Sequence, residues 1–286
     1  MRFTIAPNDA GPSRFDRIST STSQTLSPDG ASVAYVDIGP DGAQRLNLRS
    51  IDEYESRLIS SGAVVHSPFF SPDGEWVGFV GPLADLFRVS TLGGPAALIA
   101  EISTSIQGAS WTTGDTIIFS QRGAGLLRVS AQGGEPESLT SLDGAGDHGW
   151  PFLLPGERAV LFVVVPSPPA LSNGQLAVLD LDTQAVKPLG LSGVSPQYVR
   201  TRHVVYVSED SVLRAAPFDL ASLEVTGSSV PLIEGVTVQN GGWADFSVSQ
   251  NGHLTYVADP GIGPNRSRSL VLVDREGRET PLGAAW

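Results

Sequence analysis

The sequence predicts an all-β fold, a six-bladed β-propeller whose blades are four-stranded antiparallel sheets. Three observations predict it: a turn motif recurs at nearly even intervals, each copy precedes an apolar segment, and no segment shows sustained helical periodicity with caps. The intact motif, Ser-Pro-Asp-Gly, occurs at 27–30 and 71–74, each time before an alternating apolar segment.

Four degenerate copies of the motif follow the two intact ones. The six copies begin at residues 27, 71, 112, 154, 199 and 249, so they are 41 to 50 residues apart. A period of this size is typical of a propeller or a solenoid. Proline presets φ for the second turn position, aspartate bonds back to the backbone, and glycine accepts positive φ at the fourth position. Each copy therefore closes a hairpin between two strands.

The remainder of each unit repeats as well. A third strand is predicted at 86–90 and again at 126–130, each followed by a Gly-Gly turn. A fourth short strand follows at 97–99 and at 138–140. Four strands in each of six units, with no helix, predict the six-bladed propeller.

We expect one domain, 1–286, because six blades must close into a ring or leave their edges exposed. The stretch 1–8, which contains Arg2-Phe3-Thr4-Ile5, is a candidate ring-closing strand, and direct contact of the first blade with the last is the alternative. The predicted blades span approximately 20–62, 63–103, 104–143, 144–193, 194–236 and 237–286.

Composition restricts the partners. Apolar residues make up 41% of the 286 residues and charged residues 17%, which is typical of a globular chain. The net charge of −12 argues against nucleic acid as a partner. The absence of cysteine excludes disulfides and a cysteine nucleophile. The sequence shows neither a membrane-spanning segment nor a signal peptide, and it leaves the localisation open.

The repeats resemble TolB-like, WD40-like (PD40) propeller repeats. The segments FFSPDGEWVGFV, LFRVSTLGGPAALIA, DHGWPFLLPGERAVLF, APFDLASLEVTGSSVPLIEGV and SLVLVDREGRETPLG follow one another as in the propeller region commonly attached to bacterial serine/threonine protein kinases. The resemblance covers 2–283 and implies a bacterial, extracytoplasmic binding or sensing module without a known catalytic residue. The kinase motifs themselves are absent from this sequence.

Candidate ligand-binding residues precede the turn motifs, because the loops that enter the first strands of a propeller ring one face. Polar groups with aromatic walls suit a small polar ligand such as a sugar or peptide, although ordinary solvated loops would show the same residues. The candidates are His66, Gln107, Asp147, His148, Trp150, Gln197, Trp243 and Asp245.

The same residues also offer catalytic and metal-binding alternatives. His66 and His148 with Asp147 or Asp245 offer donors for a metal, but a third histidine on the same face is missing, so no metal and no cofactor is predicted. The sequence has no Gly-x-Ser-x-Gly nucleophile elbow. We therefore expect a noncatalytic module that binds a protein or a small polar ligand on the funnel face. The alternative is a hydrolase or lyase acting on a small sugar or ester in the central funnel.

Overall fold

The computed structural model describes residues 23–39, 41–53, 55–62, 64–102, 104–142, 144, 146–166, 174–239 and 242–258, together with the backbone of 270–273 and 279–281. Within these ranges the fold is all-β, and its helical structure is limited to the 3-10 turn η2 (Pro82–Ala84). No helix of the described residues is long and apolar enough to cross a membrane. The candidate ring-closing strand in 1–8 lies outside the described residues.

The first half of the chain forms three four-stranded sheets, each an antiparallel meander of strands consecutive in sequence. The strands are β1 (Gln24–Leu26), β2 (Ser32–Ile38), β3 (Gln44–Ser50) and β4 (Arg57–Gly62); β5 (His66–Phe70), β6 (Trp76–Val80), β7 (Leu86–Ser90) and β8 (Ala97–Ala100); β9 (Ile106–Trp111), β10 (Thr116–Gln121), β11 (Gly125–Ser130) and β12 (Glu137–Ser138).

The second half forms three further sheets of the same kind, of which the middle one has a fifth strand. The strands are β13 (Asp147–Leu153), β14 (Ala159–Val165), β15 (Gln175–Asp180) and β16 (Val186–Ser192); β17 (Val194–Val199), β18 (His203–Val207), β19 (Leu213–Asp219), β20 (Glu224–Val225) and β21 (Val230–Ile233); β22 (Phe246–Val248), β23 (Leu254–Val257), β24 (Leu270–Val273) and β25 (Glu279–Pro281). Both β20 and β21 pair with β19.

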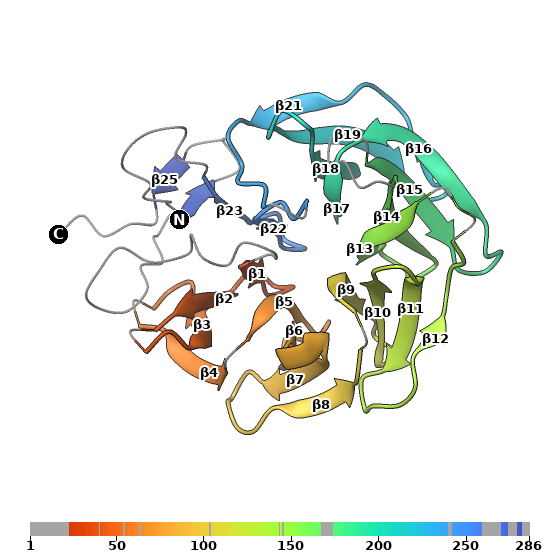
Figure 1. The fold of residues 1–286 in the computed structure, drawn as a ribbon. Helices are drawn as coiled ribbons and strands as arrows, with labels where there is room; N and C mark the ends of the chain where they lie inside the picture. Colours follow the sequence, from red (N-terminus) through yellow and green to blue (C-terminus); the bar gives the residue numbers. More distant parts are fainter. Residues whose placement is uncertain are drawn as a thin grey trace.

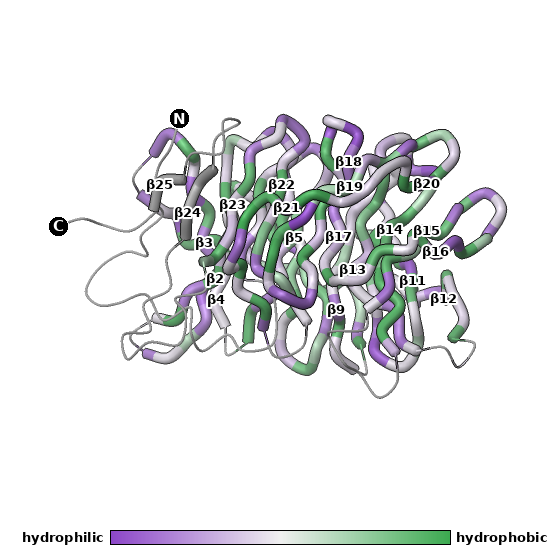
Figure 2. Tube along the Cα trace, turned by 90° about the horizontal axis from the view of Figure 1, so that it is seen from above, coloured by the Kyte–Doolittle hydropathy of each residue, from purple (hydrophilic) through white to green (hydrophobic). Residues whose placement is uncertain are grey.

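The six sheets stand in a ring around one axis (Figure 1). The first strand of each sheet, namely β1, β5, β9, β13, β17 and β22, lies nearest the axis, and the later strands lie progressively outward. In the perpendicular view, hydrophilic segments gather in the turns at the two ends of the strands (Figure 2). Among the described strands, one long edge of each innermost strand has no strand partner and faces the axis.

The repeated turn motif forms the connection between the first and second strands. Ser27 Oγ donates to Asp29 Oδ1 over 2.6 Å, and the Ala31 N–H donates to the same oxygen over 2.9 Å. Gly30 has φ of 67°, which its missing Cβ permits, and its N–H donates to the Ser27 carbonyl over 2.8 Å. The hydrogen bond from Ser27, with that from Ala31, holds the pKa of Asp29 below its usual value. The intact copy at 71–74 has the same hydrogen bonds.

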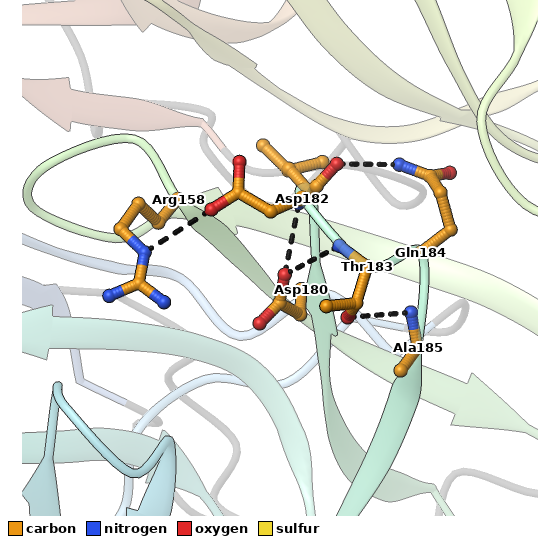
Figure 3. Close-up of polar contacts among 7 residues, drawn as sticks. Arg158, Asp180, Asp182, Thr183, Gln184 and Ala185 are labelled. Atoms are coloured by element: carbon orange, nitrogen blue, oxygen red, sulfur yellow. Dashed lines mark hydrogen bonds and ion pairs between the residues drawn. The ribbon is translucent and has the colours of Figure 1, made fainter.

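A turn on the outer part of the fourth sheet is also closed by an aspartate that accepts backbone N–H groups (Figure 3). The Asp180 carboxylate accepts hydrogen bonds from the N–H groups of Asp182 (2.9 Å) and Thr183 (3.0 Å). These bonds, that from Thr183 first, lower the pKa of Asp180. Arg158 pairs with Asp182 over 3.4 Å, so this exposed turn between β15 and β16 satisfies its own polar groups.

The hydrophobic core lies between neighbouring sheets. Side chains alternate between the two faces of each strand, so each sheet presents apolar residues to both neighbours. Phe79 and Phe87, for example, stack 5.6 Å apart on one face of the second sheet. The largest apolar cluster joins the fourth, fifth and sixth sheets, and smaller clusters join the first to the second, the second to the third and the third to the fourth.

Polar side chains join the sixth sheet to the first. The fully buried Asp245 accepts hydrogen bonds from Ser23 N–H (3.0 Å) and Ser23 Oγ–H (2.8 Å). Further bonds across this seam run from Leu26 N–H to Ser247 Oγ (3.0 Å), from Thr255 Oγ to Gln24 Oε1 (2.6 Å) and from Gln250 N–H to the Pro28 carbonyl (3.0 Å). The first and last sheets are thus in direct contact.

Candidate ligand-binding site

Four innermost strands share a backbone irregularity at the same height along the axis. Ser67, Gly108, Trp150 and Ser195 have φ of 50°, 102°, 52° and 53°. At each of them the pairing register shifts, so that two residues of the inner strand oppose one residue of its neighbour. This arrangement is a β-bulge, which re-aims side chains and commonly lies beside functional sites.

Proline follows three of the four bulge residues, at positions 68, 151 and 196. Proline has no N–H, so it fits a strand edge that offers no carbonyl partner. The left-handed conformation of Ser67, Trp150 and Ser195 costs about 1 kcal/mol or more each and persists because the surrounding sheets enforce it.

The innermost strands enclose a cavity of about 860 Å³ on the axis. Its lining extends from the bulge level to the turns that leave the innermost strands. Gln24, Trp150 and Ser195 at the bulge level are buried, whereas Thr113, Gly156 and Gln250 at the turns are exposed. The cavity is therefore closed at the bulge level and opens to solvent between the turns.

The cavity wall combines aromatic and other apolar residues with polar ones. Phe69, Trp111, Phe152, Tyr198 and Phe246 all contribute to it. The volume falls in the range of about 300–1,000 Å³ that is typical of small-molecule sites. This wall suits a ligand with a flat or apolar body.

Side chains of the wall also satisfy the free edges of neighbouring strands. Ser110 Oγ accepts a hydrogen bond from Leu153 N–H over 3.0 Å. Gln197 accepts from Val248 N–H with Oε1 (2.9 Å) and donates to the Phe246 carbonyl with Nε2 (3.2 Å). These contacts hold adjacent innermost strands at fixed distances, so the cavity has a preformed shape.

Two wall residues at the closed end keep buried polar atoms that have no hydrogen-bond partner among the described residues. These atoms are Gln24 Nε2 and Trp150 Nε1. The other buried side-chain atoms in this condition are Gln107 Oε1, Thr237 Oγ1 and Trp243 Nε1. Each of these atoms exposes less than 1 Å² to solvent, so none of them presents a donor or an acceptor to the cavity.

Charged side chains are sparse in the lining. Among the described residues that line the cavity, the side chains that are charged at neutral pH are Glu157 and Arg200, both at the open end. Glu157 accepts a hydrogen bond from Thr113 N–H over 2.6 Å, and Arg200 donates to Gln250 over 3.4 Å. The local charge is balanced although the whole chain carries −12.

Of the eight predicted site residues, Trp150 and Gln197 line the cavity. The other six do not line it, because they lie before the bulges of their strands or in the contacts between sheets. They are His66, Gln107, Asp147, His148, Trp243 and Asp245. The sequence argument expected the mouth at the loops that enter the innermost strands, whereas this cavity opens at the opposite ends of those strands.

The six residues outside the cavity have local roles. Burial lowers the pKa of His66 to about 4. His148 lies 2.7 Å from Thr140 and makes an edge contact with Phe162, with 4.8 Å between ring centroids. Asp147 accepts the N–H groups of Gly123 and of His148, each over 3.0 Å.

The remaining three lie between sheets. Gln107 donates its backbone N–H to Ser120 Oγ over 3.0 Å. Trp243 packs edge-on against Trp150, with 6.1 Å between ring centroids, and Asp245 belongs to the seam between the first and last sheets. In the part of the chain that the structure describes, no three His, Asp or Glu side chains are grouped as metal ligands would be.

Sequence reasoning missed several residues of the cavity, including Ser67, Tyr198 and Arg200. One signal was available: the dipeptides Ser67-Pro68, Trp150-Pro151 and Ser195-Pro196 stand at one repeat position. A proline within a strand marks an edge or a bulge, and a row of them marks the level at which the cavity is closed.

Comparisons with known proteins agree with the arrangement of the sheets. The chain matches no protein-family model and no curated protein sequence. Solved structures do match it, among them a protein assigned as TolB from Agrobacterium tumefaciens (14% identity, 80% of this chain and 84% of that chain covered, TM-score 0.61). The Cps50 (Swd1) β-propeller domain from Myceliophteria thermophila matches at 11% identity, with 98% and 89% covered and a TM-score of 0.61.

The chain is a β-propeller. An oligogalacturonate lyase solved in complex with manganese shares the fold at 11% identity, with 90% of this chain and 91% of that chain covered and a TM-score of 0.54. At these identities the likeness shows the TolB-like and WD40-like propeller fold and nothing finer. The solved structures that share the fold include oligogalacturonate lyases and the β-propeller domain of a protease.

Proposed function

We propose that this propeller is a noncatalytic binding module that takes a small ligand in its axial cavity through the turn face. The observation that carries the proposal is the cavity itself, which is closed at one end and has several aromatic residues in its wall. In this proposal Trp150 and Gln197 contact the ligand. A partner protein that inserts a side chain or chain end would meet the same walls.

The chemistry of the lining supports binding over catalysis. General acid–base chemistry requires at least one group positioned to move a proton at the reacting atom. Glu157 and Arg200 lie at the open end, and both are engaged in hydrogen bonds of the rim. The resemblance of the repeats to propellers attached to bacterial kinases supports a sensor role for the module.

A dye-binding experiment tests the proposal. N-phenyl-1-naphthylamine is an uncharged probe whose fluorescence increases in an apolar site, and we expect saturable enhancement with the wild-type protein. Thr25 is half-buried and lines the cavity, so Thr25→Trp should fill part of it and remove most of the enhancement. Thr183→Trp adds the same side chain to the exposed turn of Figure 3 and should leave dye binding unchanged. Equal binding by both variants would refute the axial site.

A hydrolase or lyase is the second candidate, because lyases occur among the structures that share the fold. A screen on chromogenic glycosides and esters decides between the two. The binding proposal predicts rates equal to buffer. Turnover that disappears in Glu157→Gln, the variant of the carboxylate in the described lining, would favour the enzyme.

A further inference from the structure

One position of the repeat surrounds the open end of the cavity. In all six sheets the second residue of the turn motif lines the cavity. These residues are Pro28, Pro72, Thr113, Pro155, Arg200 and Gln250. The other five are neutral, so Arg200 is the position at which the chain departs from the repeat and places a permanent positive charge at the mouth.

The guanidinium of Arg200 is exposed and is available for an anion. Its Nη2 donates to Gln250 Oε1 over 3.4 Å, which places it at the rim between the turns of the fifth and sixth sheets. A guanidinium has five N–H donors, so this long bond leaves most of them for another partner. Within the described residues Arg200 pairs with no carboxylate, whereas Arg202, two residues later, pairs with Asp219 over 3.2 Å.

Carboxylates of the neighbouring turns have other partners. Glu157, the acid in the described lining, accepts a hydrogen bond from Thr113 N–H over 2.6 Å. Asp29, Asp73 and Asp115 accept hydrogen bonds from groups of their own sheets and do not line the cavity. None of these four carboxylates forms an ion pair with Arg200, so its charge is left for a ligand.

The open end is a favourable place for an anionic head. Burying an isolated carboxylate is costly, but an anion held by an exposed arginine stays partly in water and keeps much of its hydration. The planar guanidinium matches two oxygens of a carboxylate or a sulfonate with two parallel hydrogen bonds. Tyr198 lines the cavity two residues before Arg200, so the remainder of such a ligand reaches the cavity wall directly.

We propose that the mouth of the cavity recognises the anionic head of an amphiphilic organic acid, a carboxylate or a sulfonate, through the Arg200 guanidinium. The apolar or aromatic body of the same ligand then lies in the cavity against Phe152 and Tyr198. This inference rests on the proposed function and names the class of ligand for the same cavity.

Two fluorescent probes with one ring system test the head group. 8-Anilinonaphthalene-1-sulfonate has the rings of N-phenyl-1-naphthylamine and adds a sulfonate. We expect the sulfonate probe to bind the wild type about 2- to 5-fold more tightly than the neutral probe at low salt, as expected for one exposed ion pair. NaCl at about 0.5 M should remove most of this difference, because salt screens exposed charges.

Matched variants separate the charge of Arg200 from the shape of the cavity. Arg200→Gln should weaken binding of the sulfonate probe about 2- to 5-fold and leave the neutral probe unchanged, whereas Arg200→Lys should retain most of the preference. Arg158→Gln changes the net charge of the chain by the same amount. Arg158 pairs with Asp182 outside the cavity lining, so this variant should bind both probes as the wild type does.

The outcomes distinguish this inference from the proposed function. If the neutral probe binds in the cavity but Arg200→Gln does not change binding of the sulfonate probe, the anion site is refuted and the cavity proposal stands. Equal weakening of both probes by Arg200→Gln, or of the sulfonate probe by Arg158→Gln, would also overturn the inference. If neither probe binds, the proposed function fails and this inference fails with it.

Discussion

His66 provides a sharp test of how tightly the innermost strands are packed. It begins β5, directly before the bulge residue Ser67, whose Oγ lies 3.2 Å from His66 Nδ1. Burial lowers the pKa of His66 from 6.5 to about 4 in the folded protein. The unfolded chain, with a pKa of about 6.5, therefore binds a proton that the folded chain resists.

The direction and size of the pH effect on stability follow from the difference in the His66 pKa between the folded and unfolded states. Above about pH 6.5 His66 is neutral in both the folded and the unfolded chain, so it does not change the free energy of unfolding. As the pH falls from about 6.5 to about 4, the free energy of unfolding drops by about 1.4 kcal/mol per pH unit, which amounts to about 2 kcal/mol at pH 5. The pKa values of Asp29 and Asp73 are lowered below 3.8, so those carboxylates titrate outside this window.

Urea unfolding followed by circular dichroism at pH 7.5, 6.0 and 5.0 measures the effect. His66→Gln keeps a polar side chain of similar length and removes the titration. We expect the stability difference between wild type and His66→Gln to shrink or reverse by about 2 kcal/mol between pH 7.5 and pH 5. A difference that does not change with pH would mean that His66 is solvated and that the packing described around it is incorrect.

Three substitutions test other contacts of the ring. Asp245→Ala removes the carboxylate that accepts both donors of Ser23 and leaves a buried N–H unpaired, so urea unfolding should show a loss of about 1–3 kcal/mol. Ser23→Ala removes the hydroxyl alone and should lower the free energy of unfolding by less. Equal stability of the wild type and these two variants would contradict the hydrogen bonds that join the first and last sheets. Gly78→Ala should lose about 1–3 kcal/mol in the same assay, because the added Cβ would meet the Phe69 ring at 2.2 Å. A neutral result would mean that the second sheet is loosely packed at this point.

Much of the fold could be predicted because its signals are local. The turn at 27–30 determines its own hydrogen bonds, and the alternating segments on either side of it determine a hairpin. The fifth strand of the fifth sheet, β20 (Glu224–Val225), was not predicted, because two residues that pair with the end of β19 leave no periodic signal.

The candidate site was harder to predict, because the position of a cavity depends on side chains from all six sheets. Trp150 was predicted as an aromatic wall of the ligand site. The end of the axis at which the cavity lies depends, however, on the bulge at Trp150 and on the packing of its ring against Trp243. Gln24 lines the cavity but is not among the eight predicted site residues. The period of the turn motif predicts the order of the sheets around the axis, but it does not predict which end of the axis is filled by side chains.

The most direct test of the account is a crystal structure grown with N-phenyl-1-naphthylamine. The dye should lie on the axis, between the bulge level at Trp150 and the turns near Arg200, with six sheets around it. Dye bound at the opposite ends of the innermost strands, near His66 and His148, or an axis filled by packed side chains, would contradict it.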